Sequence, residues 1–192
     1  MPREKEYDRE TVLRKVVRLF WANGLEGTSM AQLVKATGLN TASMYKEFGG
    51  KEDLYCAALD AAFETVYAPM LEPMCKQPGL VALKLYAGKM CEYALDKDYP
   101  GCIYLNNLAG RNTAPAKLLK KVEALCRQIH RLIEDCIVAA QRSGEIPAGR
   151  DAAVLASYVA CFVQGLTIYS RISRQKTRLT AATDRMIESL LQ

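Results

Sequence analysis

The sequence predicts an all-α protein in which an N-terminal three-helix domain with a helix-turn-helix precedes a larger helical domain. Apolar residues recur at helical spacing along the whole 192-residue chain, and no run alternates apolar and polar residues between hairpin turns. Helix-start and helix-stop residues bracket about nine such segments. With 50% hydrophobic and 24% charged residues, the chain has enough apolar side chains for a core.

Three short helices are predicted in the first fifty residues. Each is preceded by a residue suited to its N-cap, and these residues are Asp8, Thr28 and Asn40. Each is followed by a glycine, and these are Gly24, Gly38 and Gly49. Apolar side chains point inward from all three helices, among them Val16, Phe20, Leu33, Met44 and Phe48. We therefore expect residues 1–50 to form one compact domain.

Six further helices are predicted in residues 51–192, which we expect to form the second domain. The first starts near Lys51 and runs toward Pro69. The others are expected over residues 80–95, 102–108, 115–143, 151–173 and 180–191. Because the helix from Lys51 leaves the first domain without a linker, we expect it to carry any signal between the two domains.

The third helix has an outward face of small or hydrogen-bonding side chains. This face consists of Thr41, Ala42, Ser43, Tyr45 and Lys46. Small side chains let a helix enter the DNA major groove, and hydroxyls there reach base edges or phosphates. Residues 1–51 hold nine lysines and arginines against six acidic residues, a mild positive excess. A helix pair of this kind can also be purely structural, so spacing alone leaves both interpretations open.

The stretch from Val12 to Leu54 resembles the DNA-binding domain of the TetR family. The resemblance lies in the string LFWANGLEGTSMAQLVKATGLNTASMYKEFGGKEDL, with Gly-Thr-Ser opening the second helix and Gly-Leu at the turn. It implies a homodimer of nine-helix protomers that binds double-stranded DNA at a short palindromic operator. A small-molecule effector in the C-terminal domain would release the DNA. We therefore expect a ligand-responsive repressor.

The resemblance also implies roles for individual residues at the DNA. Thr28 and Ser29 would contact phosphates, while Thr41, Ala42 and Ser43 would face bases. Tyr45, Lys46 and Lys51 would contact the DNA backbone, and the helix start at Asn40 would offer N–H groups to an anion. Many relatives carry Lys, Gly or Arg where this chain has Thr41-Ala42. Direct base readout is therefore expected to be weak, with a larger contribution from DNA shape.

In the family, the last two helices pair with those of a second copy. Small side chains recur along residues 151–173, and the last helix has an apolar face. The expected interface residues are Ala153, Ala156, Ser157, Ala160, Met186, Ile187 and Leu190. The alternative is that these residues form a core within one chain. Residues 152–169 are uncharged, but their polar and small residues favour a buried helix over a membrane span, so no membrane is expected.

A ligand cavity is expected among the helices between residues 80 and 162. The candidate lining residues are Tyr86, Met90, Tyr93, Cys102, Tyr104, Cys126, His130 and Phe162. They favour a largely apolar or electrophilic effector, although such residues also form ordinary cores. Cys102 follows Pro100-Gly101 at a predicted helix start, which would favour a reactive thiolate. The alternative is that Cys102 is a small core residue.

Several function classes are not expected. The seven cysteines include no Cys-x-x-Cys pair, and the sequence MPREKEYDRE contains no apolar stretch, so we expect a reduced, cytoplasmic protein without a signal peptide. The single histidine, His130, makes a metal centre improbable. Acyl-transfer, phosphate-loop and cofactor motifs are absent, so neither an enzyme nor a cofactor is expected. A protein-interaction module that has lost DNA binding is the remaining rival.

Overall fold

The computed structural model of the chain describes residues 7–97, 101–105 and 114–192. Within these ranges the protein is all-helical, as predicted. The elements are α1 (Arg9–Asn23), α2 (Met30–Thr37), α3 (Thr41–Phe48), α4 (Lys51–Ala62), the π-helical turn η1 (Phe63–Tyr67), α5 (Ala68–Lys76), α6 (Leu80–Ala94), α7 (Ala116–Arg142), α8 (Ala152–Tyr169) and α9 (Lys176–Leu190). Because η1 joins α4 to α5 without a break, these elements make eight separate helices within the described ranges.

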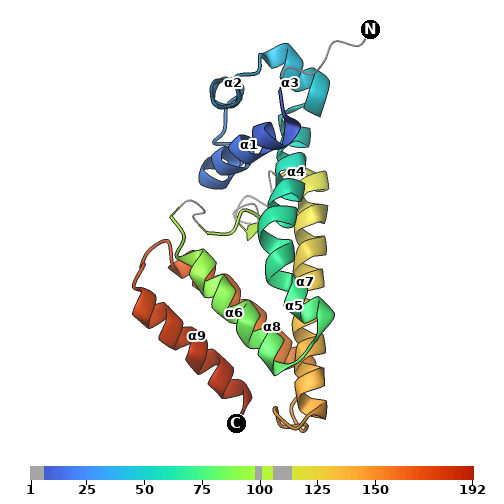
Figure 1. Cartoon of the computed structure of the whole chain (residues 1–192), viewed down its shortest axis with the longest axis vertical. Coiled ribbons are helices and arrows are strands. Elements are labelled where there is room, and N and C mark those ends of the chain that lie inside the picture. The colour runs from blue at the N-terminus through green and yellow to red at the C-terminus, as the bar shows by residue number, and fades with distance from the viewer. Residues whose placement is uncertain (1–6, 98–100, 106–113) are drawn as a thin grey trace.

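The helices are arranged in two parts of an elongated molecule (Figure 1). α1, α2 and α3 form a small unit at one end, which we call the head. The helices from α4 onward form the body. α4 packs on α1 and then runs alongside α7, while α6 and α8 lie beside α7 and α9 covers α6 and α8 from outside.

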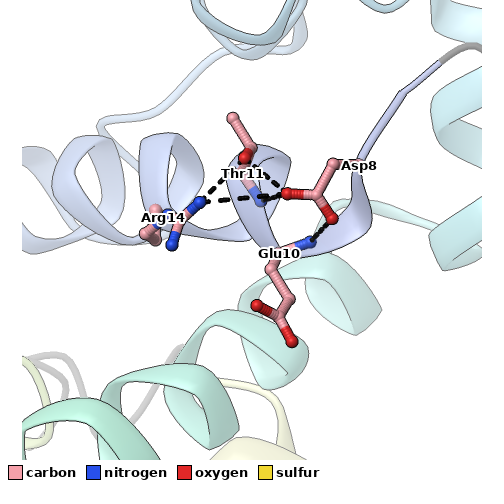
Figure 2. A network of polar contacts seen from close by, with 4 residues as sticks. All are labelled: Asp8, Glu10, Thr11 and Arg14. Atoms are coloured by element: carbon pink, nitrogen blue, oxygen red, sulfur yellow. Dashed lines mark hydrogen bonds and ion pairs between the residues drawn. The ribbon is translucent and has the colours of Figure 1, made fainter.

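The start of α1 illustrates how the sequence sets a helix boundary locally (Figure 2). The Asp8 carboxylate accepts hydrogen bonds from the backbone N–H groups of Glu10, at 3.2 Å, and Thr11, at 3.0 Å. The Thr11 hydroxyl also donates to Asp8 and accepts from Arg14 at 2.8 Å. The hydrogen bonds from Thr11 hold the pKa of Asp8 below its usual value. The predicted N-cap at Asp8 is thus present.

Three predicted helix boundaries are corrected by the structure. The helix from Lys51 does not stop near Pro69 but continues through η1 and α5 to Lys76. Pro69 follows the π turn and lies in the first turn of α5, where its lack of an N–H is tolerated. The last helix begins at Lys176, four residues before Thr180. Residues 101–105 form turns and no α-helix, and the remainder of the helix predicted over 102–108 lies outside the described residues.

One continuous apolar core joins the head to the body. It contains Val16 and Phe20 of α1, Leu59 of α4, and Ile133 and Ile137 of α7, all almost fully buried. The Phe20 ring meets the Tyr55 ring edge-on, with 4.5 Å between centroids. The head and the body are therefore packed on each other through one shared core.

Candidate nucleic-acid interface and internal cavity

α2 and α3 form a helix-turn-helix whose two starts are capped by side chains. The Ser29 hydroxyl accepts from the Gln32 N–H at 3.2 Å, and the Gln32 side chain accepts from the Ser29 N–H at 2.7 Å, which makes a capping box. Asn40 Oδ1 accepts from the Ser43 N–H at 2.8 Å. Between the helices, Gly38 has a φ of 78°, a conformation that favours glycine. The turn angle and the start of α3 are therefore set by local hydrogen bonds.

α3 exposes the face that the sequence predicts. Thr41, Ala42 and Lys46 are exposed, and Tyr45 is 51% exposed. Ser43 is half-buried. Met44 and Phe48 are buried against the rest of the head. The outer surface of α3 therefore consists of small, polar and basic groups, which is chemically suited to the major groove.

The one acidic residue of α3 is neutralised within the head. A carboxylate oxygen of Glu47 lies 3.4 Å from Arg9 Nε, and the Tyr7 hydroxyl donates to Glu47 at 2.9 Å. The Arg9 guanidinium also lies 5.5 Å from the centre of the Phe48 ring. These contacts tie α3 to the start of α1. They also leave Lys46 as the uncompensated charge of the helix.

The start of α4 adds a second basic position beside α3. Gly49 has a φ of 87°, and a β-carbon at Gly49 would lie 2.7 Å from Asp53 Oδ2, so the tight turn requires glycine. α4 then begins after Gly50 with no side-chain cap and with Lys51 as its first residue. Lys117 of α7 donates to Asp53 at 2.6 Å and, with its charge, lowers the pKa of that carboxyl. The Asp53 charge is thereby compensated from the body.

Thr28 does not lie where the resemblance implies. Its side chain is completely buried, and its hydroxyl donates to the carbonyl of Gly24 at 2.7 Å. The residue therefore closes the loop between α1 and α2 instead of facing a phosphate, and Ser29 is the N-cap that the sequence assigned to Thr28. Ser29 and Asn40 are exposed, so they stay available as predicted DNA contacts.

A cavity of about 50 Å³ lies in the body between α6, α7, α8 and the 101–105 turn, and its lining includes the half-buried Cys126 and the exposed Gln164. Five of the predicted residues line it: Tyr86, Met90, Cys102, Tyr104 and Cys126. Tyr67, Ile129, Gln164 and Thr167 are further lining residues. Among the described residues, the lining contains no charged side chain, which suits a neutral occupant.

Three predicted lining residues do not line this cavity. Tyr93 packs behind it against Trp21 and Tyr67. His130 Nε2 lies 3.1 Å from the Ser157 hydroxyl at the exposed contact of α7 with α8. Phe162 packs toward Leu166 and Leu179, between α8 and α9. Helical periodicity places all three residues on apolar faces. Whether such a face lines the cavity or contacts another helix depends on how the helices pack.

The prediction that Cys102 is a reactive thiolate is also corrected. Cys102 is buried, and desolvation raises the pKa of its thiol although a hydrogen bond with Tyr67 opposes that shift. Its Sγ lies 3.1 Å from the Tyr67 hydroxyl. Burial likewise raises the pKa of Tyr67, Tyr86 and Cys126. The cavity lining is therefore neutral near pH 7, and the exposed cysteines are instead Cys75 and Cys161.

The predicted dimer residues divide into two groups. Ala156, Met186, Ile187 and Leu190 are buried in the protomer's own core, which corrects their assignment to an interface. Ala153 and Ser157 are exposed and Ala160 is half-buried, although Ala160 also lines the cavity. The outward surface of α8 carries larger apolar residues that the small-residue pattern did not indicate. These are Val154, Tyr158, Ile168 and Tyr169.

α8 (Ala152–Tyr169) is the one helix within the described residues that is long and apolar enough to cross a membrane. The core helix of a soluble protein meets the same criterion, so this single helix is weak evidence for a membrane span. About a third of its residues are buried against the rest of the body. The described residues contain no group of three or more His, Cys, Asp or Glu side chains that could hold a metal ion.

A capped helix-turn-helix with an exposed polar face, joined to a larger helical body, defines a helix-turn-helix regulator. Residues 12–58 match the family described as "Bacterial regulatory proteins, tetR family", and residues 79–186 match "Tetracyclin repressor-like, C-terminal domain". The chain therefore belongs to the TetR family of DNA-binding transcriptional regulators, which are not enzymes.

Individual relatives agree with this assignment. The chain is 31% identical over 172 residues to the HTH-type transcriptional repressor ComR of Escherichia coli (strain K12), covering 88% of this chain and 82% of ComR. Its fold is similar to that of a TetR transcriptional regulator from Chloroflexus aurantiacus, with 25% identity, a TM-score of 0.84, and coverage of 96% and 94% of the two chains. A cysteine mutant of the TetR family regulator CifR, complexed with 26bp double-strand operator DNA, has the same fold at 22% identity, with a TM-score of 0.84 and coverage of 97% and 98%.

Proposed function

We propose that this protein is a homodimeric repressor that binds a palindromic operator and is released by a small neutral effector. The observation that carries the proposal is the outer face of α3, which is exposed, polar and basic within a capped helix-turn-helix. The similarity to the repressor ComR over most of both chains supports repression. Such a regulator acts on DNA in the cytoplasm.

In this proposal residues 1–50 bind DNA through α3 and the helix starts beside it. Thr41, Ala42 and Ser43 face base edges, and Tyr45, Lys46 and Lys51 contact the backbone, together with Ser29 and Asn40. The exposed face offers few groups that can make two hydrogen bonds to one base. Operator choice therefore depends in part on the shape and deformability of the DNA.

Residues 51–192 provide the dimer interface and the effector site. The exposed apolar side chains of α8 are the proposed interface, because a patch of this kind is rarely left in contact with water. The neutral cavity lined by Tyr86, Met90, Cys102 and Tyr104 is the proposed effector site. Because the described part of its lining holds no charged side chain, a compact neutral molecule fits it better than an ion.

Selection of binding sites from random DNA duplexes tests the proposal. We expect the full-length protein to select a two-fold symmetric sequence whose half-sites are centred about 34–36 Å apart, or a multiple of that distance. Fluorescence anisotropy on the selected duplex should show one dimer per site. Selection of no sequence at all, with equal affinity for every duplex, would contradict the proposal and favour a protein-interaction module.

A further inference from the structure

Trp21, the single tryptophan of the chain, connects the head to the body at one point. It lies in the last turns of α1 and is 1% exposed. Its ring is stacked parallel to the Tyr67 ring, with 6.3 Å between centroids, and its indole N–H donates to the carbonyl of Gly101 at 3.0 Å. Trp21 thus holds two separate segments of the body by two different kinds of contact.

Two of the partners of Trp21 lie at or next to the wall of the cavity. Tyr67 lines the cavity, and Gly101 directly precedes the lining residue Cys102, whose Sγ lies 3.1 Å from the Tyr67 hydroxyl. Tyr104, also in the lining, meets the Tyr67 ring edge-on at 5.1 Å and donates to the carbonyl of Leu59 at 2.7 Å. A displacement of this wall therefore acts on Trp21 directly.

The size of the cavity implies that its wall must move when it is filled. Its volume is about 50 Å³, whereas a cavity of about 150 Å³ is needed to hold a molecule such as benzene. Most of the lining comes from α6, α7 and α8, whose backbone hydrogen bonds resist deformation. Residues 101–104 contain a bend and turns and Leu105 is 3-10 helical, so this part of the wall is not held by the hydrogen bonds of an α-helix and is the easiest to displace.

We propose that Trp21 is the residue that couples occupancy of the cavity to the position of the head. An occupant pushes the 101–105 turn outward, and the bond from the Trp21 indole to Gly101 shifts or breaks. α1 then moves relative to α4, so an occupant that prefers this arrangement shifts the population away from the DNA-binding form. The inference rests on the proposed function. It adds a second path for the signal from body to head, through Trp21 of α1, to the path through α4.

The test replaces an unknown ligand by a side chain that fills the cavity. Cys126 of α7 lines the cavity, and Cys126→Phe introduces a ring that the present volume cannot hold. Affinity for a selected operator duplex is measured by anisotropy in wild type, C126F, W21F and the double variant. Trp21→Phe keeps an aromatic ring beside Tyr67 but removes the N–H that reaches Gly101.

We expect C126F to weaken operator binding about tenfold, within the range typical of coupled sites. W21F alone should change operator affinity by less than about threefold. In the W21F background, Cys126→Phe should lower operator affinity by less than about threefold. Tyr93→Phe is the matched control, because the Tyr93 ring touches Trp21 and Tyr67 but does not line the cavity. In that background the loss caused by C126F should be undiminished.

The outcomes separate this inference from the proposed function. If C126F weakens binding equally with and without Trp21, the cavity controls DNA binding by another route and the role of Trp21 is overturned. If folded C126F binds the operator like wild type, both the effector site and the coupling are overturned. Circular dichroism checks folding. If C126F does not fold, Ile129→Phe replaces it, because Ile129 lines the same cavity and this substitution adds less side-chain volume. Trp21 fluorescence reports whether C126F displaces the wall beside it, and an unchanged spectrum in folded C126F would contradict that displacement.

Discussion

α3 and α8 both present an exposed face, but the two faces have opposite chemistry. α3 exposes Thr41, Ala42 and Lys46, which are small, polar or basic. α8 exposes Val154, Tyr158 and Ile168, which are apolar or aromatic. Groups of the first kind keep their hydrogen bonds with water until a polar partner replaces them, whereas burial of the second kind is favourable in itself. The contrast is the reason why we propose DNA as the partner of α3 and a second copy of the chain as the partner of α8.

The largest effect is expected on the α8 face. Ile168→Arg places a charge where we propose that two copies meet, so the dimer should dissociate. Since two half-sites bound by one dimer gain from effective concentration, operator affinity should fall by about 100-fold or more. Sedimentation and anisotropy measure the two effects.

Val81→Arg is the control for that change. Val81 is 68% exposed, but it lies at the start of α6, in a groove with residues of α5 and α7. This variant should remain dimeric and bind the operator normally. An unchanged dimer in Ile168→Arg would place the interface elsewhere and remove the contrast between the two helices.

The next effect is expected beside α3. Lys51→Ala removes a proposed phosphate contact, which should weaken binding to all DNA sequences alike. Each phosphate contact contributes about 0.9 to the slope of log affinity against log salt concentration, so the loss of one contact from each protomer of the dimer should reduce that slope by about 1.8. Titrations at several salt concentrations measure the slope. Lys84→Ala, at an exposed position of α6, is the charge-matched control. A slope that changes equally in both variants would mean that Lys51 acts only through net charge.

A smaller effect concerns the cysteines. Cys75 and Cys161 are both exposed in the protomer, but only Cys161 lies on α8. Brief alkylation followed by mass spectrometry should modify Cys75 first, and Cys161 only after Ile168→Arg has separated the copies. Cys102 should react slowly in both states, because burial excludes the reagent and raises the pKa of its thiol. Equal rates at Cys75 and Cys161 in the wild type would argue against an interface on α8.

The smallest effect is expected at the contact between α4 and α7. Lys117→Gln removes the ion pair with Asp53, and since both side chains are exposed the loss of stability should be slight. The hydrogen bond from Lys117 lowers the Asp53 pKa below 3.8 in the folded state. The difference in stability between wild type and variant should therefore be complete above about pH 5 and be lost as the pH falls through that lowered pKa. Urea titrations at pH 7 and pH 3 measure it, and a difference of the same size at both pH values would contradict this origin.

Features that depend on neighbouring residues were predicted well from the sequence. The caps at Asp8, Asn40 and Asp151 and the stop at Gly38 all arise from hydrogen bonds or backbone angles within a few residues. The inward positions of Met44 and Phe48 follow from the period of a single helix, which in turn leaves the polar face of α3 outside.

Features that depend on contacts between distant segments were not predicted well from the sequence. α8 is apolar on nearly every side, so its periodicity could not distinguish buried Ala156 from exposed Ile168. Cys102 became a buried thiol because Tyr67, 35 residues away, packs against it. Trp21 reaches Gly101 across 80 residues. The sequence by itself determined most of the helices, the caps at Asp8 and Asn40 and the polar face of α3, because these depend on local chemistry. Only the tertiary structure decided which apolar faces became core, cavity or surface, because that depends on which segments pack together.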